Sequence, residues 1–372
     1  MQDAPSQIKP SVLAIDAMGS DAGPEAIVAG AAEAVRSGID ATLKFFGRAE
    51  ILQSLVSAQE ELTDVSVIDV ENVVAMTDKP MHVLRRGRDT SMWAAVTDAA
   101  EGNADAIVSG GNTGALMAVA RRQFGMIDGV DRPAISAFWP TPNGRSVVLD
   151  VGANVEADEK QLVDFAIMGE AYFRAITGKS KPSVGLLNVG AEELKGHELI
   201  KRAASVLREA DPEMDFRGFI EGNDISAGAV DVVVTDGFTG NIALKSAEGA
   251  ARLVSGWMKD ALTGSFLAKM GALLMMRELK KLKTKSDPSS VNGGVFLGLN
   301  GIVVKSHGSA DAAGVASAIR LASSVAGRGF RRDVAQQIAI VTKRWRAQQA
   351  AAPLVQSTTA QDELGSSVKA VV

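Results

Sequence analysis

Runs rich in Gly, Asn, Ser and Thr follow several apolar segments of this sequence, and each run stands directly before a segment with a helical pattern. Glycine lets a backbone approach a ligand closely. The first N–H groups of a helix carry the positive end of its dipole, which suits phosphate. One such turn is weak evidence, because it often serves only to reverse the chain, but several at one edge of a sheet predict an anion site. The runs are residues 16–21, 109–114, 152–154, 189–197, 236–241 and 305–309.

Other familiar sites are missing from the sequence. Residues 178–180 resemble the end of a P-loop, but Phe173 stands where the leading glycine is required. His197 does not begin a zincin motif, because Lys201 stands where the second histidine belongs. No serine-hydrolase elbow is present. With only three histidines and no cysteine, we expect no metal site, disulfide or cysteine nucleophile; the histidines are His82, His197 and His307.

The composition is that of a globular protein outside the nucleic-acid-binding classes. The chain has 372 residues, of which 46% are hydrophobic and 22% charged, and its net charge is -5. An acidic balance disfavours a nucleic-acid partner, which usually meets a basic face. We see no secretory signal and no apolar run of about 18 residues, so we expect a cytoplasmic protein without a membrane span.

The elements that position the polar runs are short apolar segments without strict alternation, which is typical of parallel strands covered on both faces. They alternate with helical patterns such as residues 26–37, so we expect an α/β fold with a mostly parallel sheet. Ligands bind beyond the carboxyl ends of such strands, and we therefore expect the polar runs at one edge of the sheet. Strands are predicted at residues 12–15, 41–46, 65–70, 106–108, 147–151, 184–188, 230–235 and 302–304.

A single catalytic domain is predicted over residues 10–346, between a disordered start at 1–9 and a loose tail at 347–372. One part of it, residues 255–290, departs from the strand–helix pattern. Apolar residues recur there every four positions and lysines follow, as in an amphipathic element at a membrane surface. A helix pair that packs in a dimer is the alternative, and Gly264 and Gly271 could divide the segment. The residues predicted to touch the membrane are Phe266, Leu273 and Leu274.

Six motifs occur in order along the chain. They are Ile-Asp-Ala-Met-Gly at 15–19, Gly-Asn-Thr-Gly-Ala-Leu at 111–116, Leu-Asp-Val-Gly-Ala-Asn at 149–154, Gly-Leu-Leu-Asn-Val-Gly at 185–190, Asp-Gly-Phe-Thr-Gly-Asn at 236–241 and His-Gly-Ser at 307–309. Together they resemble the PlsX-type phosphate acyltransferase family over residues 12–326. The sequence departs from the family pattern at Ser20, Gly110 and Ala191, and in the arginine-rich run at 85–88.

This resemblance implies an enzyme that moves a fatty acyl group from acyl carrier protein to inorganic phosphate and makes acyl phosphate for phospholipid synthesis. It implies no cofactor and a three-layer αβα fold similar to isopropylmalate dehydrogenase and phosphotransacetylase. It also implies a homodimer at the inner face of the cell membrane, linked to a downstream glycerol-3-phosphate acyltransferase.

For that reaction phosphate itself can attack the thioester, and the protein must position it and stabilise the oxyanion. We expect Asn112, Thr113 and Gly114 to hold phosphate or the oxyanion, and His307 to act as acid or base. Further binding residues are predicted at Asp16, Gly19, Ser20 and Asn154, and further catalytic residues at Lys195, Lys245, Asp236 and Asn241. Of these, Asp16, Asn154, Asp236 and Asn241 are expected to orient the reacting groups. For the predicted lysines, Lys195 and Lys245, the alternative is a solvated surface charge, and for Asp16 and Asp236 it is a helix cap.

The basic run Arg85, Arg86 and Arg88 could dock the acidic carrier protein, and a solvated loop is the alternative. Three other functions remain open from the residues alone. A short-chain phosphotransacetylase leaves the apolar segment at 255–290 unexplained. A metal-dependent hydroxyacid dehydrogenase needs clustered aspartates and a nucleotide loop, neither of which is clear. A non-catalytic membrane scaffold predicts phosphate binding without turnover.

Overall fold

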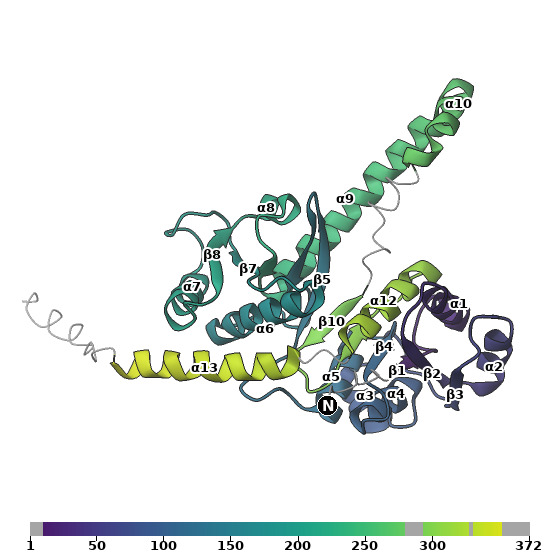
Figure 1. Ribbon diagram of the computed structural model, residues 1–372, viewed down its shortest axis with the longest axis horizontal. Helices are drawn as coiled ribbons and strands as arrows, with labels where there is room; N and C mark the ends of the chain where they lie inside the picture. The colour runs from purple at the N-terminus through teal and green to yellow at the C-terminus, as the bar shows by residue number, and fades with distance from the viewer. Residues whose placement is uncertain (1–9, 280–292, 327–329, 352–372) are drawn as a thin grey trace, which may run out of the picture.

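The computed structural model describes residues 10–279, 293–326 and 330–351, and the predicted disordered start lies outside them (Figure 1). In these residues one sheet of 11 strands runs in the order β3-β2-β1-β4-β11-β10-β5-β6-β9-β7-β8. The strands are β1 (Ser11–Asp16), β2 (Ala41–Gly47), β3 (Val65–Asp69), β4 (Ala106–Ser109), β5 (Ala134–Thr141), β6 (Gly144–Leu149), β7 (Ser183–Leu187), β8 (Asp215–Ile220), β9 (Val232–Val234), β10 (Gly294–Leu297) and β11 (Val303–Lys305).

Helices cover both faces of the sheet, because the strands bury apolar side chains on both. One face packs against α1 (Gly23–Arg36), α2 (Ala49–Ser57), α6 (Glu159–Thr177), α7 (Glu198–Ala210), α12 (Ala312–Val325) and α13 (Phe330–Ala351). The other face packs against α3 (Pro80–Arg86), α4 (Ser91–Ala100), α5 (Thr113–Phe124), α8 (Gly222–Ala227) and α9 (Gly237–Thr263). The predicted three-layer αβα fold with a mostly parallel sheet is confirmed.

The strands fall into two parallel groups that run in opposite directions. β3, β2, β1, β4 and β11 form one group, and β6, β9, β7 and β8 form the other. Between them lie β10 and β5, which pair with each other and with their outer neighbours in antiparallel fashion. The prediction that all polar runs share one edge is therefore wrong, because the carboxyl ends of the two groups point opposite ways.

The register brings the two sets of carboxyl ends together instead. Lys305 at the end of β11 pairs with Gly294, the neighbouring Val295 pairs with Ser136, and Ser136 pairs with Leu149 at the end of β6. The two groups are staggered along the sheet, so that strands arriving from opposite directions end at nearly the same level. Polar loops of both groups thus face each other across β10 and β5.

Eight strands agree with the predicted segments, whereas β5, β8 and β10 were not predicted. β5 ends in Pro140 and Thr141, and β8 contains a glycine with positive φ, Gly218. Proline and glycine are depleted in strands, which weakens the signal of these two runs.

The segment predicted at 255–290 is the outer part of a longer helix pair. α9 begins 18 residues earlier, at Gly237, and runs for 27 residues to Thr263. α10 (Phe266–Leu274) follows, with the Ser265 hydroxyl accepting a hydrogen bond from the Ala268 N–H. The pair extends away from the body of the molecule (Figure 1). The break falls at Gly264 and not at Gly271, and the lysines at 280, 281, 283 and 285 lie outside the described residues.

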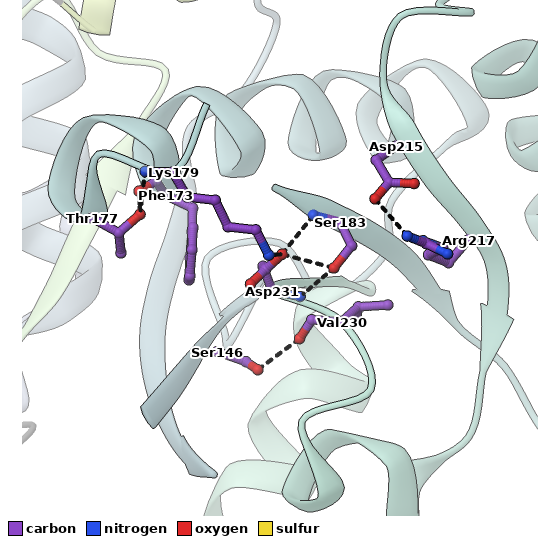
Figure 2. A network of polar contacts seen from close by, with 9 residues as sticks. All are labelled: Ser146, Phe173, Thr177, Lys179, Ser183, Asp215, Arg217, Val230 and Asp231. Atoms are coloured by element: carbon purple, nitrogen blue, oxygen red, sulfur yellow. Dashed lines mark hydrogen bonds and ion pairs between the residues drawn. The ribbon is translucent and has the colours of Figure 1, made fainter. Parts of the chain in front are cut away.

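Residues at the opposite, amino end of β7 and β9 form a structural network (Figure 2). The Asp231 carboxylate accepts hydrogen bonds from the Ser183 N–H at 2.6 Å and hydroxyl at 2.7 Å, and Lys179 Nζ lies 2.5 Å from it. On the neighbouring strand the Ser146 hydroxyl donates to the Val230 carbonyl at 2.7 Å. Lys179, the lysine of the P-loop-like run, therefore joins the loop after α6 to the residue before β9. At the far end of the chain, α13 continues to Ala351, past the predicted boundary at 346.

Candidate functional site

A cavity of about 760 Å³ lies where the carboxyl ends of the two strand groups meet. The first group contributes the start of α5 and the loop after β11. The second group contributes the loop after β6 and the first half of α9, and β5 lines the cavity between them. The lining includes Gly111–Gly114, Ile135–Pro140, Val151, Gly152, Asn241, Leu244, Lys245, Ala247, Ala251 and Lys305–Gly308.

The cavity has a polar end and a longer, mostly apolar wall that also carries Lys245 and Glu248 of α9. Its polar end combines the amino terminus of α5 with the side chains of Lys305, His307 and Asp21. Its apolar wall is formed by Ala137 and Trp139 of β5 and by apolar side chains of α9. The ten helical steps from Asn241 to Ala251 correspond to a wall roughly 15 Å long, at about 1.5 Å per step. Such a cavity suits a ligand with an anionic head and an apolar tail.

At the start of α5, the hydrogen-bonding atoms of the Asn112 side chain are occupied by other groups of the protein. Its Oδ1 accepts from the Ala115 N–H at 3.0 Å, and its Nδ2 donates to the carbonyls of Met76 at 2.8 Å and Asp78 at 2.9 Å. Asn112 therefore shapes the loop, and its side chain does not offer the predicted hydrogen bond to phosphate. The backbone N–H groups of Thr113 and Gly114 head the helix at the cavity, where an anion benefits from the dipole.

Asp16 is fully buried beneath the loops of the first strand group. Its two carboxylate oxygens accept hydrogen bonds from the hydroxyls of Ser91 and Ser109, each at 2.7 Å. Burial raises the pKa of Asp16, and the hydroxyl and backbone donors oppose that rise. Asp16 is not a helix cap, since it ends β1, and it does not line the cavity. It positions the residues that do.

Gly19 and Ser20 have the same positioning role. A Cβ on Gly19 would lie 2.6 Å from the Asp16 carboxylate and 3.1 Å from the Gly111 Cα, so only glycine fits here without a shift. The Ser20 hydroxyl donates to the Gly308 carbonyl at 2.7 Å and thereby joins the loop after β1 to the loop after β11.

Asp150 is the counterpart of Asp16 in the second strand group, and it was not predicted. Its carboxylate accepts five N–H groups: those of Ile135, Gly152 and Ala153, and both the backbone and side-chain N–H of Asn154, at 2.7–3.2 Å. Burial raises the pKa of Asp150, and these donors favour the ionised form against it. Its signal in the sequence was an aspartate at the end of the apolar run 147–149.

The start of α9 is built on this carboxylate. The Asn154 carbonyl accepts from the Gly237 N–H at 2.8 Å, and the Asp236 carboxylate caps the helix through the Thr239 N–H at 2.8 Å. The Asn241 side chain lines the cavity and donates to the Val151 carbonyl at 3.0 Å. Asn154 and Asp236 are thus positioning residues, and Asp236 is the helix cap that the alternative interpretation described.

The predicted cations and the histidine do not all meet. Lys245 of α9 and His307 line the cavity, and the Nδ1 atom of His307 lies 3.0 Å from the Ser309 hydroxyl. Lys195, which was predicted to be catalytic, does not line it. Its ammonium pairs with the Glu192 carboxylate at 2.7 Å, and this hydrogen bond raises the pKa of Lys195.

Lys305 lines the polar end of the cavity and was not predicted. It is the last residue of β11, and its ammonium donates to the Gly110 carbonyl at 3.1 Å and to the Ser306 carbonyl. Its signal in the sequence was a lysine at the end of the buried segment 302–304, directly before the Ser-His-Gly-Ser run.

The residues predicted for partner contacts lie on the surface. Arg85 and Arg86 end α3 and Arg88 follows it, and all three are exposed. The first residue of α3, Pro80, lies beside Gly114 at the cavity. On α10, Phe266, Leu273 and Leu274 have exposed fractions of 77%, 57% and 86%.

Comparison with known proteins identifies relatives over nearly the whole fold. The family described as fatty acid synthesis protein matches residues 11–333. A phosphate acyltransferase of Maricaulis maris is 54% identical over 326 residues, which are 87% of this chain and 93% of the relative. A phosphate acyltransferase of Caulobacter vibrioides is 48% identical over 332 residues, 89% of this chain and 92% of the relative.

Solved structures with low sequence identity share the fold. The EutD phosphotransacetylase from Staphylococcus aureus covers 86% of this chain and 95% of its own, with a TM-score of 0.57 and 16% identity. A 4-hydroxythreonine-4-phosphate dehydrogenase from Klebsiella pneumoniae covers 86% of this chain and 99% of its own, with a TM-score of 0.50 and 15% identity.

The role of Asp150 is tested by the Asp150→Asn variant. We expect its free energy of unfolding in urea to fall by about 1–3 kcal/mol, because an amide NH₂ replaces an acceptor and faces N–H donors. Asp236→Asn is the matched control, since asparagine caps a helix about as well as aspartate and should change stability little. Equal stability of the two variants would show that Asp150 does not hold the loops.

Proposed function

We propose that this chain, which belongs to the phosphate acyltransferases of the fatty acid synthesis protein family, moves a long-chain fatty acyl group from acyl carrier protein to inorganic phosphate. The product is acyl phosphate for phospholipid synthesis. Acyl transfer to phosphate in this branch of metabolism is common to the family, whereas the carrier protein and the product are our inference.

The observation that carries the proposal is the union of two surfaces in one cavity. The α5 terminus with its N–H groups offers a phosphate site, and the wall formed by Trp139 and Leu244 offers a site for an apolar chain. Phosphate bound at the polar end would meet the carbonyl of an acyl chain that lies along the wall. Holding the two reactants this way converts a bimolecular step into a nearly unimolecular one.

The reaction needs no covalent enzyme intermediate. An oxygen of phosphate attacks the thioester carbonyl carbon, the C–O bond forms, and the C–S bond breaks with the electron pair on sulfur. The proton of monohydrogen phosphate ends on that sulfur. His307 lies at the polar end and is the proposed acid or base, and Lys245, Lys195 and Asn241 remain proposed catalytic groups, of which Lys195 would require movement into the cavity.

We assign Arg85, Arg86 and Arg88 to docking of the acidic carrier protein. Because α3 starts beside Gly114 and has 7 residues, its basic end lies within roughly 10 Å of the cavity along the helix axis. A carrier protein bound there could direct its thioester arm toward the α5 terminus.

We assign the outer face of α9 and α10 to a membrane surface. Exposed apolar side chains cluster there, including Trp257 at 63%, Phe266 at 77% and Leu274 at 86%. Among the described residues no helix is long and apolar enough to cross a bilayer. The product carries an apolar chain, so contact with the inner face of the cell membrane would let a cytoplasmic homodimer pass it to a glycerol-3-phosphate acyltransferase.

The activity is tested with purified protein, palmitoyl-acyl carrier protein and inorganic phosphate. We expect release of carrier thiol only when phosphate is present, and a hydroxamate when hydroxylamine traps the acyl phosphate. Thiol release without phosphate would indicate a hydrolase. A folded protein that binds phosphate but releases no thiol would exclude this substrate.

Carrier docking is tested by reversing the basic run with Arg85→Glu and Arg86→Glu. We expect the KM for acyl carrier protein to rise about three- to tenfold, more at low salt, with kcat little changed, because rim charges act mainly on association. Lys343→Glu makes the same kind of charge change on exposed α13 and should leave this KM unchanged. If Lys343→Glu raised the KM for acyl carrier protein as much as the change on α3, the effect would come from the net charge of the protein and not from docking at α3.

Membrane contact is tested by co-sedimentation with liposomes that contain anionic lipid. We expect Leu273→Asp with Leu274→Asp to lower the bound fraction severalfold, because charged side chains cannot enter the acyl region cheaply. Leu194→Asp is the matched control, because Leu194 is 90% exposed but lies in a loop away from α10, and its substitution should leave the bound fraction unchanged. If the double variant still sediments like the parent protein, α10 is not the contact.

A further inference from the structure

Lys305 occupies an unusual place for a lysine. β11 lies between β4 and β10 near the middle of the sheet, and Lys305 pairs through its backbone with Ser109 and Gly294. Its side chain is mostly buried and reaches the polar end of the cavity. Buried ammonium groups are costly unless they are paired.

The contacts of the ammonium show which way it faces. Two of its three N–H donors are accepted by carbonyls of the described residues, those of Gly110 and Ser306. Gly110 stands three residues before Thr113, the first residue of α5, and Lys305, Thr113 and Gly114 line the same cavity. The cation and the positive end of the helix dipole thus converge on one region of the cavity.

The nearby carboxylates do not neutralise Lys305 in the way a structural ion pair would. Asp16 and Asp21 are close enough to stabilise its charge, but both Asp16 oxygens accept serine hydroxyls. Burial lowers the pKa of Lys305 to about 8, and the two carboxylates oppose that fall. Besides Asp21, the charged or titratable groups among the described residues that line this cavity are His307, from the same loop, and Lys245 and Glu248 of α9. The cation is therefore present at neutral pH and directed at a cavity.

We propose that the Lys305 ammonium binds the attacking phosphate and holds it against the amino terminus of α5. This inference rests on the proposed function, for which phosphate is the nucleophile. Phosphate would take the remaining N–H of Lys305 and the N–H groups of Thr113 and Gly114. Lys305 keeps its proton throughout and supplies charge, so the balance of the reaction is unchanged.

The first test compares Lys305→Met and Lys305→Arg with the parent enzyme at varied phosphate. For Lys305→Met we expect the KM for phosphate to rise about 10- to 100-fold, as for a lost hydrogen bond to a charged group, with a much smaller change in the KM for acyl carrier protein. Lys305→Arg should recover part of the loss. Lys44→Met is the matched control, because Lys44 is a part-buried lysine paired with Asp98, and its phosphate KM should not change.

The second test is the pH profile of kcat/KM for phosphate, which reports groups of the free enzyme. Since the pKa of Lys305 lies near 8, its charge is present below that pH and lost above it. We expect kcat/KM in the parent enzyme to fall about tenfold per pH unit above pH 8. The Arg variant should lack this fall, because guanidinium does not titrate in this range. The same alkaline fall in both proteins would overturn the inference.

Direct binding separates this inference from the proposed function. Calorimetry with inorganic phosphate alone should give binding to the parent protein and at least tenfold weaker binding to Lys305→Met, while circular dichroism shows that both are folded. Lys305-dependent phosphate binding without thiol release would refute the acyl transfer and leave the site standing. Normal turnover and normal phosphate binding by Lys305→Met would refute the site alone.

Discussion

Two buried carboxylates, Asp16 and Asp150, hold the loops from which the cavity is made, and most of the site depends on them. Each follows the buried end of a strand, and each is surrounded by donors from its own loop and from a neighbouring segment. A desolvated carboxylate is costly, and the hydrogen bonds that offset the cost fix the positions of the donors. The same two residues also leave no room for side chains at neighbouring glycines. A Cβ on Gly240 would lie 2.0 Å from the Asp150 carbonyl, and one on Gly19 would lie 2.6 Å from the Asp16 carboxylate.

Because the strand direction reverses at β10 and β5, the loops built on Asp16 and Asp150 face the same cavity from opposite sides. A uniformly parallel sheet would place both at one open edge, where a ligand contacts one layer of loops. Here each strand group brings its own helix terminus, α5 from one side and α9 from the other. The reacting phosphate and the acyl chain can thus be held by different halves of the fold. β5, which joins the halves, supplies part of the wall between them.

The sequence predicted the layers, eight of the strands and the loops that carry the site, because buried strands and glycine turns have local signatures. It could not show which side chains the loops use internally. Asn112 looks like a ligand by type, yet its amide is consumed by the carbonyls of Met76 and Asp78. Conversely, Lys305 looks like the end of a strand, and only the pairing of β11 between β4 and β10 places it in the cavity. Such roles depend on contacts between residues far apart in sequence.

The long helix α9 connects the chemistry to the surface. Its first turn is fixed by Asp150 through Asn154 and Gly237, its first half lines the cavity, and its second half carries Leu253, Val254 and Trp257 into solvent. One continuous helix therefore reaches from the cavity wall to the exposed apolar face. The part of α9 that lines the cavity combines the apolar Leu244, Ala247 and Ala251 with the charged Lys245 and Glu248. The proposed binding of the acyl chain and the proposed membrane contact would then depend on two halves of the same helix.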